Sequence, residues 1–179
     1  GQIGLRGRSI RQKIVTFSST YVDTRRARKA YNGCMPAKRI LIVEDNLGDA
    51  RLIEEILGQS PAFEVALTYV GRLSHAVNHL AQQPTDVVLL DLFLPDGQGL
   101  EGLSRLQAVS PNIPIIVLSG MADRALALDA VKHGAQDYLI KGTVNVDMLT
   151  RIIQYSIERK KAEERYRSLV VNIPGVIYS

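Results

Sequence analysis

The chain has 179 residues, which suits one globular domain with additional segments and is short for two domains. Hydrophobic residues make up 46% of it, yet no stretch approaches the roughly 18 uninterrupted apolar residues of a membrane span. Residues 1–37 hold eight basic residues and one acidic residue, so they carry +7, whereas the remaining residues carry −3. The basic charge therefore belongs to one segment and does not indicate a nucleic-acid-binding surface over the whole protein.

The basic segment itself shows no sustained helix or strand period. Met35 looks like a natural start, and we predict that residues 1–37 form a disordered extension or translated upstream sequence. A targeting peptide is the alternative, because such leaders are also rich in arginine and serine and poor in acids. The single cysteine, Cys34, excludes an internal disulfide.

From Lys38 onward, apolar runs of strand length alternate with segments of helical period. Strands are predicted at 39–43, 63–70, 86–91, 114–119 and 136–141. Helices are predicted after Asn46, over 72–82, around Leu100–Leu106, over 123–133 and from about Val144 to Val171. This alternation predicts a doubly wound α/β fold, in which helices cover both faces of a parallel sheet. Right-handed crossovers favour the strand order 2-1-3-4-5.

Polar residues follow the apolar runs at matching places. They are Glu44 and Asp45 after the first strand, Asp91 after the third, Ser119 after the fourth and Lys141 after the fifth. Because parallel strands end at one edge of the sheet, we expect these side chains to converge. Three carboxylates repel one another unless a cation lies among them, and oxygen ligands favour Mg²⁺. A neutralised carboxylate could then attack phosphorus and form an aspartyl phosphate.

Four motifs carry a resemblance to a known family. They are "LIVEDN" (41–46), "LLDLFLPDGQGLE" (89–101), "VLSG" (117–120) and "GAQDYLIKG" (134–142). Residues 38–141 with the next helix resemble the CheY-like receiver domain of response regulators in two-component signalling. The resemblance implies a flavodoxin-like fold and a cytoplasmic, phosphorylation-dependent switch that is not itself an enzyme. It also implies a histidine kinase or phosphotransfer protein as partner.

The same resemblance assigns roles to individual residues. Asp91 would be the phosphoacceptor, and Glu44 and Asp45 would bind Mg²⁺ together with Asp91 and the backbone carbonyl of Phe93. Ser119 and Tyr138 would form the switch pair, and Lys141 would contact the phosphoryl group. We expect Ser119 and Tyr138 on the side of the sheet that borders the fifth helix. Two residues depart from the family pattern: Gly142 stands where proline is usual, and Glu44 where aspartate is commoner.

Two enzyme classes are alternatives. "GQGLEG" (97–102) matches the G-x-G-x-x-G pattern of dinucleotide-binding oxidoreductases, but five residues separate it from Asp91, so its glycines do not form the tight strand-to-helix turn. A phosphohydrolase would also use a strand-end aspartate as nucleophile. Such enzymes place a second acid two residues later, where this chain has the apolar Phe93.

The chain after Lys141 is divided further. Residues 38–142 are predicted as the receiver core, 143–167 as the fifth helix and a linker helix, and 168–179 as the truncated start of a domain. "AEERYRSLVVNIPGVIYS" (162–179) resembles the opening of a PAS domain, with a long terminal helix as the alternative. We expect a weak parallel homodimer through this helix, and neither specific nucleic-acid binding nor membrane binding. Its predicted seam consists of Leu149, Ile152, Ile153, Ile157, Tyr166 and Leu169.

Overall fold

The computed structural model describes residues 20–22, 37–120 and 123–171. The strands are β1 (Thr20–Val22), β2 (Lys38–Val43), β3 (Val65–Val70), β4 (Val87–Asp91), β5 (Phe93–Leu94), β6 (Gly97–Gln98), β7 (Ile115–Ser119) and β8 (Asp137–Ile140). The helices are α2 (Leu47–Gly58), α3 (Leu73–Gln82), α4 (Leu100–Val109), α5 (Arg124–Lys132) and α6 (Val146–Val171). None of these helices is long and apolar enough to cross a lipid bilayer.

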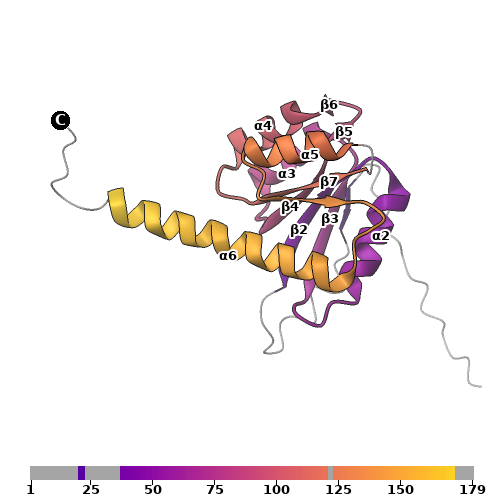
Figure 1. The fold of residues 1–179 in the computed structure, drawn as a ribbon, viewed down its shortest axis with the longest axis horizontal. Coiled ribbons are helices and arrows are strands. Elements are labelled where there is room, and N and C mark those ends of the chain that lie inside the picture. Colours follow the sequence, from indigo (N-terminus) through magenta and orange to yellow (C-terminus); the bar gives the residue numbers. More distant parts are fainter. Residues whose placement is uncertain (1–19, 23–36, 121–122, 172–179) are drawn as a thin grey trace, which may run out of the picture.

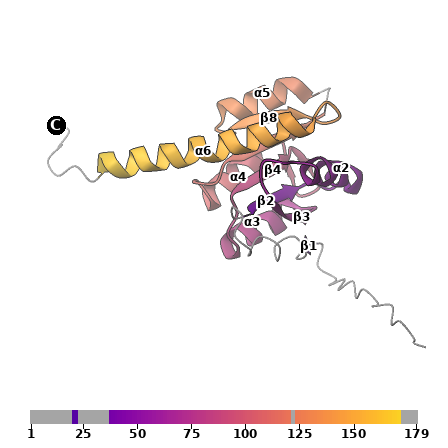
Figure 2. The ribbon, with the colours of Figure 1, turned by 90° about the horizontal axis from the view of Figure 1, so that it is seen from below.

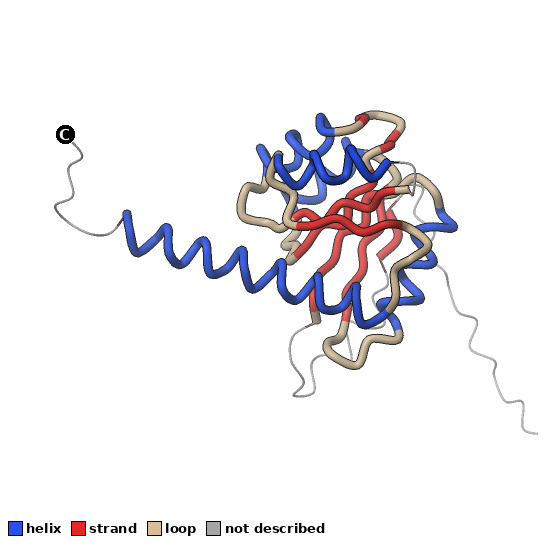
Figure 3. The backbone as a smooth tube through the Cα atoms, viewed as in Figure 1, coloured by secondary structure: helices blue, strands red, loops and turns tan. Residues whose placement is uncertain are grey.

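The main sheet has the order β1-β3-β2-β4-β7-β8, and all its neighbours from β3 to β8 pair in parallel. Numbered along the chain, those five strands run 2-1-3-4-5, so the predicted doubly wound topology is confirmed. Their register brings the carboxyl ends level, because Val43 pairs with both Val70 and Leu90 and Asp91 pairs with Leu118. The carboxyl ends of these strands therefore share one edge of the sheet. Figure 3 shows the strands together in the middle of the domain with helices around them.

Helices cover both faces of the sheet (Figures 1 and 2). Side chains alternate between the faces along each strand, so Leu41 and Val43 pack with α3, α4 and α5, whereas Ile40 and Ile42 pack with α2 and α6. Both clusters consist of buried hydrophobic residues, nearly all of them aliphatic. The central strands β4 and β7 are buried along their whole length, as expected for a parallel sheet with two covered faces.

Two features were not predicted. Thr20–Val22 adds a sixth strand that pairs antiparallel with β3, so the prediction of a disordered extension is wrong for these three residues. The other residues of 1–36 lie outside the described part of the chain. A small hairpin, β5–β6, follows the buried strand β4. Both elements are too short to show a strand period in the sequence. They are strands because their backbones pair with a neighbouring strand, which a local sequence pattern does not indicate.

The C-terminal helix begins two residues later than predicted, because Asn145 caps it: its side chain accepts a hydrogen bond from the Met148 amide at 2.8 Å. With 26 residues, α6 is about 39 Å long. Its first half packs on the sheet beside α2, and its second half projects beyond the domain (Figure 1). No residue with described burial after Ile157 is buried.

This arrangement changes the predicted dimer seam. Leu149, Ile153 and Ile157 are buried against the sheet of their own chain, so their assignment to an intermolecular seam is wrong. Tyr166 and Leu169 are exposed. Helix α6 runs on to Val171, into the segment that resembles the start of a PAS domain, and residues 172–179 lie outside the described part of the chain.

Candidate functional site

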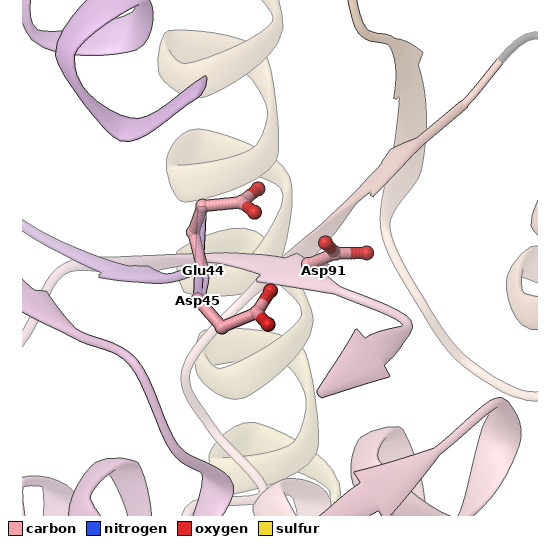
Figure 4. A group of neighbouring side chains, drawn as sticks. All are labelled: Glu44, Asp45 and Asp91. Atoms are coloured by element: carbon pink, nitrogen blue, oxygen red, sulfur yellow. The ribbon is translucent and has the colours of Figure 1, made fainter. Parts of the chain in front are cut away.

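Three carboxylates meet at the carboxyl edge of the sheet. Glu44 and Asp45 follow β2 directly, and Asp91 is the last residue of the neighbouring strand β4. Each offers one oxygen, and these oxygens all lie within 4.8 Å of one another (Figure 4). Glu44 is completely buried and Asp91 almost so, whereas Asp45 is exposed. The predicted convergence of these acids is therefore observed.

Lys141 reaches into this group from the end of β8. Its Nζ lies 2.6 Å from Glu44 Oε2 and 2.8 Å from Asp91 Oδ2. The Lys141 amide also donates to the Ser119 carbonyl at 2.8 Å, which ties the ends of β7 and β8 together. The lysine thus supplies positive charge directly between two buried carboxylates.

Burial and neighbouring charges shift the pKa values of Glu44 and Lys141 in opposite directions. Burial raises the pKa of Glu44 to about 7, although the hydrogen bond and charge of Lys141 pull it down. Burial alone would lower the pKa of Lys141, but the carboxylates of Asp91 and Glu44 outweigh it and raise that pKa above the usual value. Lys141 therefore remains an ammonium and offsets part of the negative charge at the strand ends.

Backbone amides orient the two buried acids. The Phe93 amide donates to Asp91 Oδ1 at 3.0 Å, which leaves Oδ2 facing Lys141. The Asn46 amide donates to Glu44 Oε1 at 3.1 Å. Asn46 also caps α2, because its side chain accepts a hydrogen bond from the Gly48 amide at 2.8 Å. The start of α2 and the start of the β5–β6 hairpin consequently fix both carboxylates.

The acidic group suits a divalent cation. Carboxylate oxygens at this spacing are the hard ligands that Mg²⁺ binds, and Asp45 is open to solvent from which an ion and its waters arrive. Glu44, Asp45 and Asp91 form the only such group of potential metal ligands within the described residues.

The residues expected to form the switch pair lie at the end of β7 and within β8. Ser119 is buried, and its hydroxyl donates to the Gly120 carbonyl at 3.1 Å. Tyr138 is half-buried and packs against the cluster formed with α3, α4 and α5. Helix α6 covers the opposite face, so the expectation that these residues border it is wrong. Ser119 shares the face of Val117 and Tyr138, since side chains two positions apart on a strand point the same way.

One residue at the site was missed. Asp49, in the first turn of α2, lies 3.1 Å from Lys141 Nζ through its Oδ2. The sequence contained a signal, because Asp49 follows Asp45 by about one helical turn and the helix starts at the functional edge of the sheet. Glu44, Asp49, Lys141 and Gly142 together help to line a small recess beside the acidic group.

The glycine-rich motif has a structural explanation. Asp96 and Gly97 belong to the β5–β6 hairpin, and a Cβ on Gly97 would come within 2.5 Å of Leu73 Cδ2. Gly99 precedes α4 with φ of +60°, a conformation that glycine adopts readily. These glycines shape a hairpin against α3, so the dinucleotide-binding alternative is not supported. The phosphohydrolase alternative is not supported either, because the side chain two residues after Asp91 is the half-exposed Phe93.

A family model described as "Response regulator receiver domain" matches residues 40–154. The chain belongs to this family. It contains a CheY-like receiver domain of two-component signalling, a regulatory phosphoacceptor switch, as the resemblance implied. Receiver domains bind Mg²⁺ in the active site and interact with histidine kinases or phosphotransfer proteins.

The share of each relative that this chain covers differs widely. The chain is 31% identical to the chemotaxis protein CheY of Thermotoga maritima over 58% of this chain and 85% of that protein. It is 32% identical to a protein-glutamate methylesterase/protein-glutamine glutaminase of Nocardioides sp., over 76% of this chain but only 37% of that protein. The receiver domain of the sensor histidine kinase PA1611 from Pseudomonas aeruginosa, solved with magnesium in its active-site cleft, is 29% identical. That match covers 68% of this chain and 98% of the solved one, with a TM-score of 0.58.

Gly142 stands where the family sequence pattern usually has proline. It follows Lys141 with φ of +83°, and the described residues contain no cis peptide bond. Proline cannot adopt a positive φ, so this loop conformation excludes the residue that the family usually has here.

Proposed function

We propose that Asp91 is the residue that accepts the phosphoryl group, from a histidine kinase, a phosphotransfer protein or a small phosphodonor. The observation that carries this proposal is the position of Asp91 Oδ2, 2.8 Å from Lys141 Nζ at the edge where Glu44 and Asp45 also end. A phosphoryl group adds negative charge to an aspartate, and an adjacent ammonium offsets that charge.

In this proposal, Glu44, Asp45 and Asp91 hold Mg²⁺ together with the backbone carbonyl of Phe93. A bound magnesium ion would neutralise the carboxylates and the incoming phosphoryl oxygens. An oxygen of Asp91 forms the new bond to phosphorus while the bond to the donor's leaving atom breaks, and the electron pair departs with the leaving group. The Phe93 amide keeps the Asp91 carboxylate in a fixed orientation for this step.

We further propose that Lys141 and Ser119 bind the phosphoryl group and change their contacts when it is present. Lys141 would exchange its contact with Asp91 for one with a phosphoryl oxygen, and the Ser119 hydroxyl would turn from the Gly120 carbonyl toward another. Tyr138 would follow, since it lies on the same face of the sheet and packs there only partly buried. The change would therefore spread through the face covered by α3, α4 and α5.

The domain would act as a switch in a cytoplasmic protein and have no catalytic output of its own. The projecting half of α6 supports a role in passing the change to a further module, and residues 168–179 resemble the start of a PAS domain. A weak homodimer through that half of the helix is part of this proposal.

Incubation with acetyl phosphate and Mg²⁺ tests the central assignment. Wild-type protein should gain one phosphoryl group in its intact mass, and EDTA should prevent the gain. Asp91→Asn should remain unmodified, whereas Asp129→Asn, the same change at a half-exposed position on α5, should be labelled normally. Labelling of Asp91→Asn at the wild-type level would refute the role of Asp91.

A further inference from the structure

Lys141 has a third carboxylate partner that lies outside the strand-end group. Its Nζ contacts Glu44 at 2.6 Å, Asp91 at 2.8 Å and Asp49 at 3.1 Å. The ammonium donates hydrogen bonds to Asp91 and Asp49, whereas its contact with Glu44 is an ion pair. Asp49 belongs to the first turn of α2 and is not among the three acids that lie within 4.8 Å of one another. It is a fourth negative charge held at the site through the lysine.

The position of Asp49 is more specific than a helix start requires. The helix dipole stabilises an acidic side chain in the first turn whatever direction the side chain takes. The dipole therefore explains why an acid is present at position 49 but not why its carboxylate contacts Lys141. The Asp49 carboxylate is aimed at a lysine 92 residues away and, with Lys141 and Gly142, lines the recess beside the site. Its side chain is 38% exposed, so it faces the solvent from which a phosphodonor arrives.

Asp49 decides whether a donor meets a neutral or a negative site. Mg²⁺ requires ionised carboxylate ligands, so in the metal-loaded site Glu44, Asp45, Asp49 and Asp91 against Lys141 contribute a protein charge of −3. A divalent cation leaves −1, whereas the same site without the Asp49 charge would be neutral. At this short range and partial burial, one unit charge is enough to alter the approach of an anion.

We propose that Asp49 determines phosphodonor specificity, because its carboxylate keeps the metal-loaded site negative and disfavours strongly anionic donors. This inference rests on the proposed role of Asp91. With acetyl phosphate, an Asp91 oxygen bonds to phosphorus, the P–O bond to acetate breaks, and the electron pair leaves with acetate. With phosphoramidate, whose nitrogen carries three protons in the monoanion, an Asp91 oxygen bonds to phosphorus, the P–N bond breaks, and the electron pair leaves on nitrogen as ammonia. Acetyl phosphate is a dianion near neutral pH and phosphoramidate a monoanion, so the negative site should slow the former more.

The test compares both donors on the full chain at saturating Mg²⁺. Asp49→Asn should accelerate labelling by acetyl phosphate about threefold to tenfold, and labelling by phosphoramidate distinctly less. Asp49→Glu, which keeps the charge, should retain the wild-type ratio of the two rates. The matched control is Glu55→Gln, which removes one charge from the exposed face of the same helix and should leave both rates unchanged.

The ratio of the two rates separates donor selection from a merely structural role, since a distorted site would change both rates together. An unchanged ratio in Asp49→Asn, or an equal change in Glu55→Gln, would overturn the role of Asp49 while wild-type labelling at Asp91 still stands. Absence of labelling of the wild type by both donors would overturn the assignment of Asp91 and this inference with it.

Discussion

The carboxylate of Asp96 caps a helix that begins 23 residues earlier in the chain, at Leu73. The Leu73 amide donates to Asp96 Oδ1 at 2.7 Å, and the Ser74 amide donates to Oδ2 at 2.9 Å. The residue at the cap position of α3, Arg72, makes no side-chain capping bond of its own. Asp96 therefore fastens the hairpin that follows Asp91 to α3.

Loss of this cap should destabilise the domain. We expect Asp96→Ala to lower the free energy of unfolding by about 1 kcal/mol, because two amides at a helix start lose their acceptor. Asp96→Asn keeps one acceptor oxygen and should cost less. Urea denaturation followed by circular dichroism measures both, with Gln98→Ala on the same hairpin as the control. If Asp96→Ala unfolded at the same urea concentration as the control, the capping role would be wrong.

A second prediction concerns the stability of the domain in acid. The Asp86 carboxylate accepts hydrogen bonds from the Arg39 guanidinium at 2.7 and 3.1 Å and from its amide at 2.8 Å. Burial alone would raise the pKa of Asp86, but the bonds and charge of Arg39 outweigh it and lower that pKa. Because the folded pKa lies below the unfolded one, the stabilisation is complete above about pH 4 and is lost as the pH falls through the folded pKa.

Asp86→Asn should therefore reduce stability at pH 7 by about 1 kcal/mol or less, since both side chains are partly exposed. The difference from wild type should shrink between about pH 4 and pH 2. Unfolding free energies measured across this range test the prediction, with Asp129→Asn at a half-exposed position on α5 as the control. A difference from wild type that stayed constant down to the lowest pH would contradict it.

A third prediction separates the two acids after β2. Glu44 is buried and paired with Lys141, whereas Asp45 is exposed at the rim. We expect Asp45→Ala to weaken Mg²⁺ binding at least about tenfold, and Glu44→Ala to weaken it less. Isothermal titration calorimetry measures both affinities, with Glu55→Gln on α2 as the control. Wild-type affinity in Asp45→Ala would exclude that residue as a ligand.

The sequence predicted the sheet and its functional edge because both follow from local pattern. Buried strands of a parallel sheet read as apolar runs, and the residue after each run lies at the same edge whatever packs around it. Glu44, Asp45, Asp91 and Lys141 could therefore be placed together before any coordinates were known.

Relations across the sheet could not be predicted in this way. Alternation assigns Tyr138 and Leu139 to opposite faces but does not say which face α6 covers. The apolar stripe of α6 likewise fits the core of its own domain or a partner helix, and the choice depends on packing that no local pattern records. Asp96 directly precedes the glycine-rich motif, and its role as a cap of α3 became evident only when the hairpin was seen against that helix.

A fourth prediction concerns the switch. Binding of beryllofluoride with Mg²⁺, a phosphoryl mimic, should shift the NMR signals of the Tyr138 ring, because Ser119 and Tyr138 share one face of the sheet. In Ser119→Ala the mimic should still bind, but the Tyr138 shift should be much smaller. Tyr155, exposed on α6, serves as the internal control. Unchanged Tyr138 signals in the wild type on saturation with the mimic would refute the proposed coupling.

The last prediction concerns the projecting half of α6. Leu149, Ile153 and Ile157 are already buried in the domain, and the exposed members of the predicted seam are Tyr166 and Leu169, each about 70% exposed. Two such residues bury little surface, and we therefore expect a dimer with a dissociation constant in the high micromolar range or weaker.

Sedimentation equilibrium of the beryllofluoride form at high micromolar concentration tests this association. Leu169→Glu should return the protein to a monomer, because it places like charges opposite each other in a parallel pair. The matched control is Arg159→Glu, which changes charge within the intramolecular i,i+4 pair with Glu163 and should alter local helix stability by only a few tenths of a kcal/mol. A wild-type protein that remained monomeric at every concentration would exclude dimerisation through α6. The receiver assignment would stand, because it depends on the sheet edge and not on this helix.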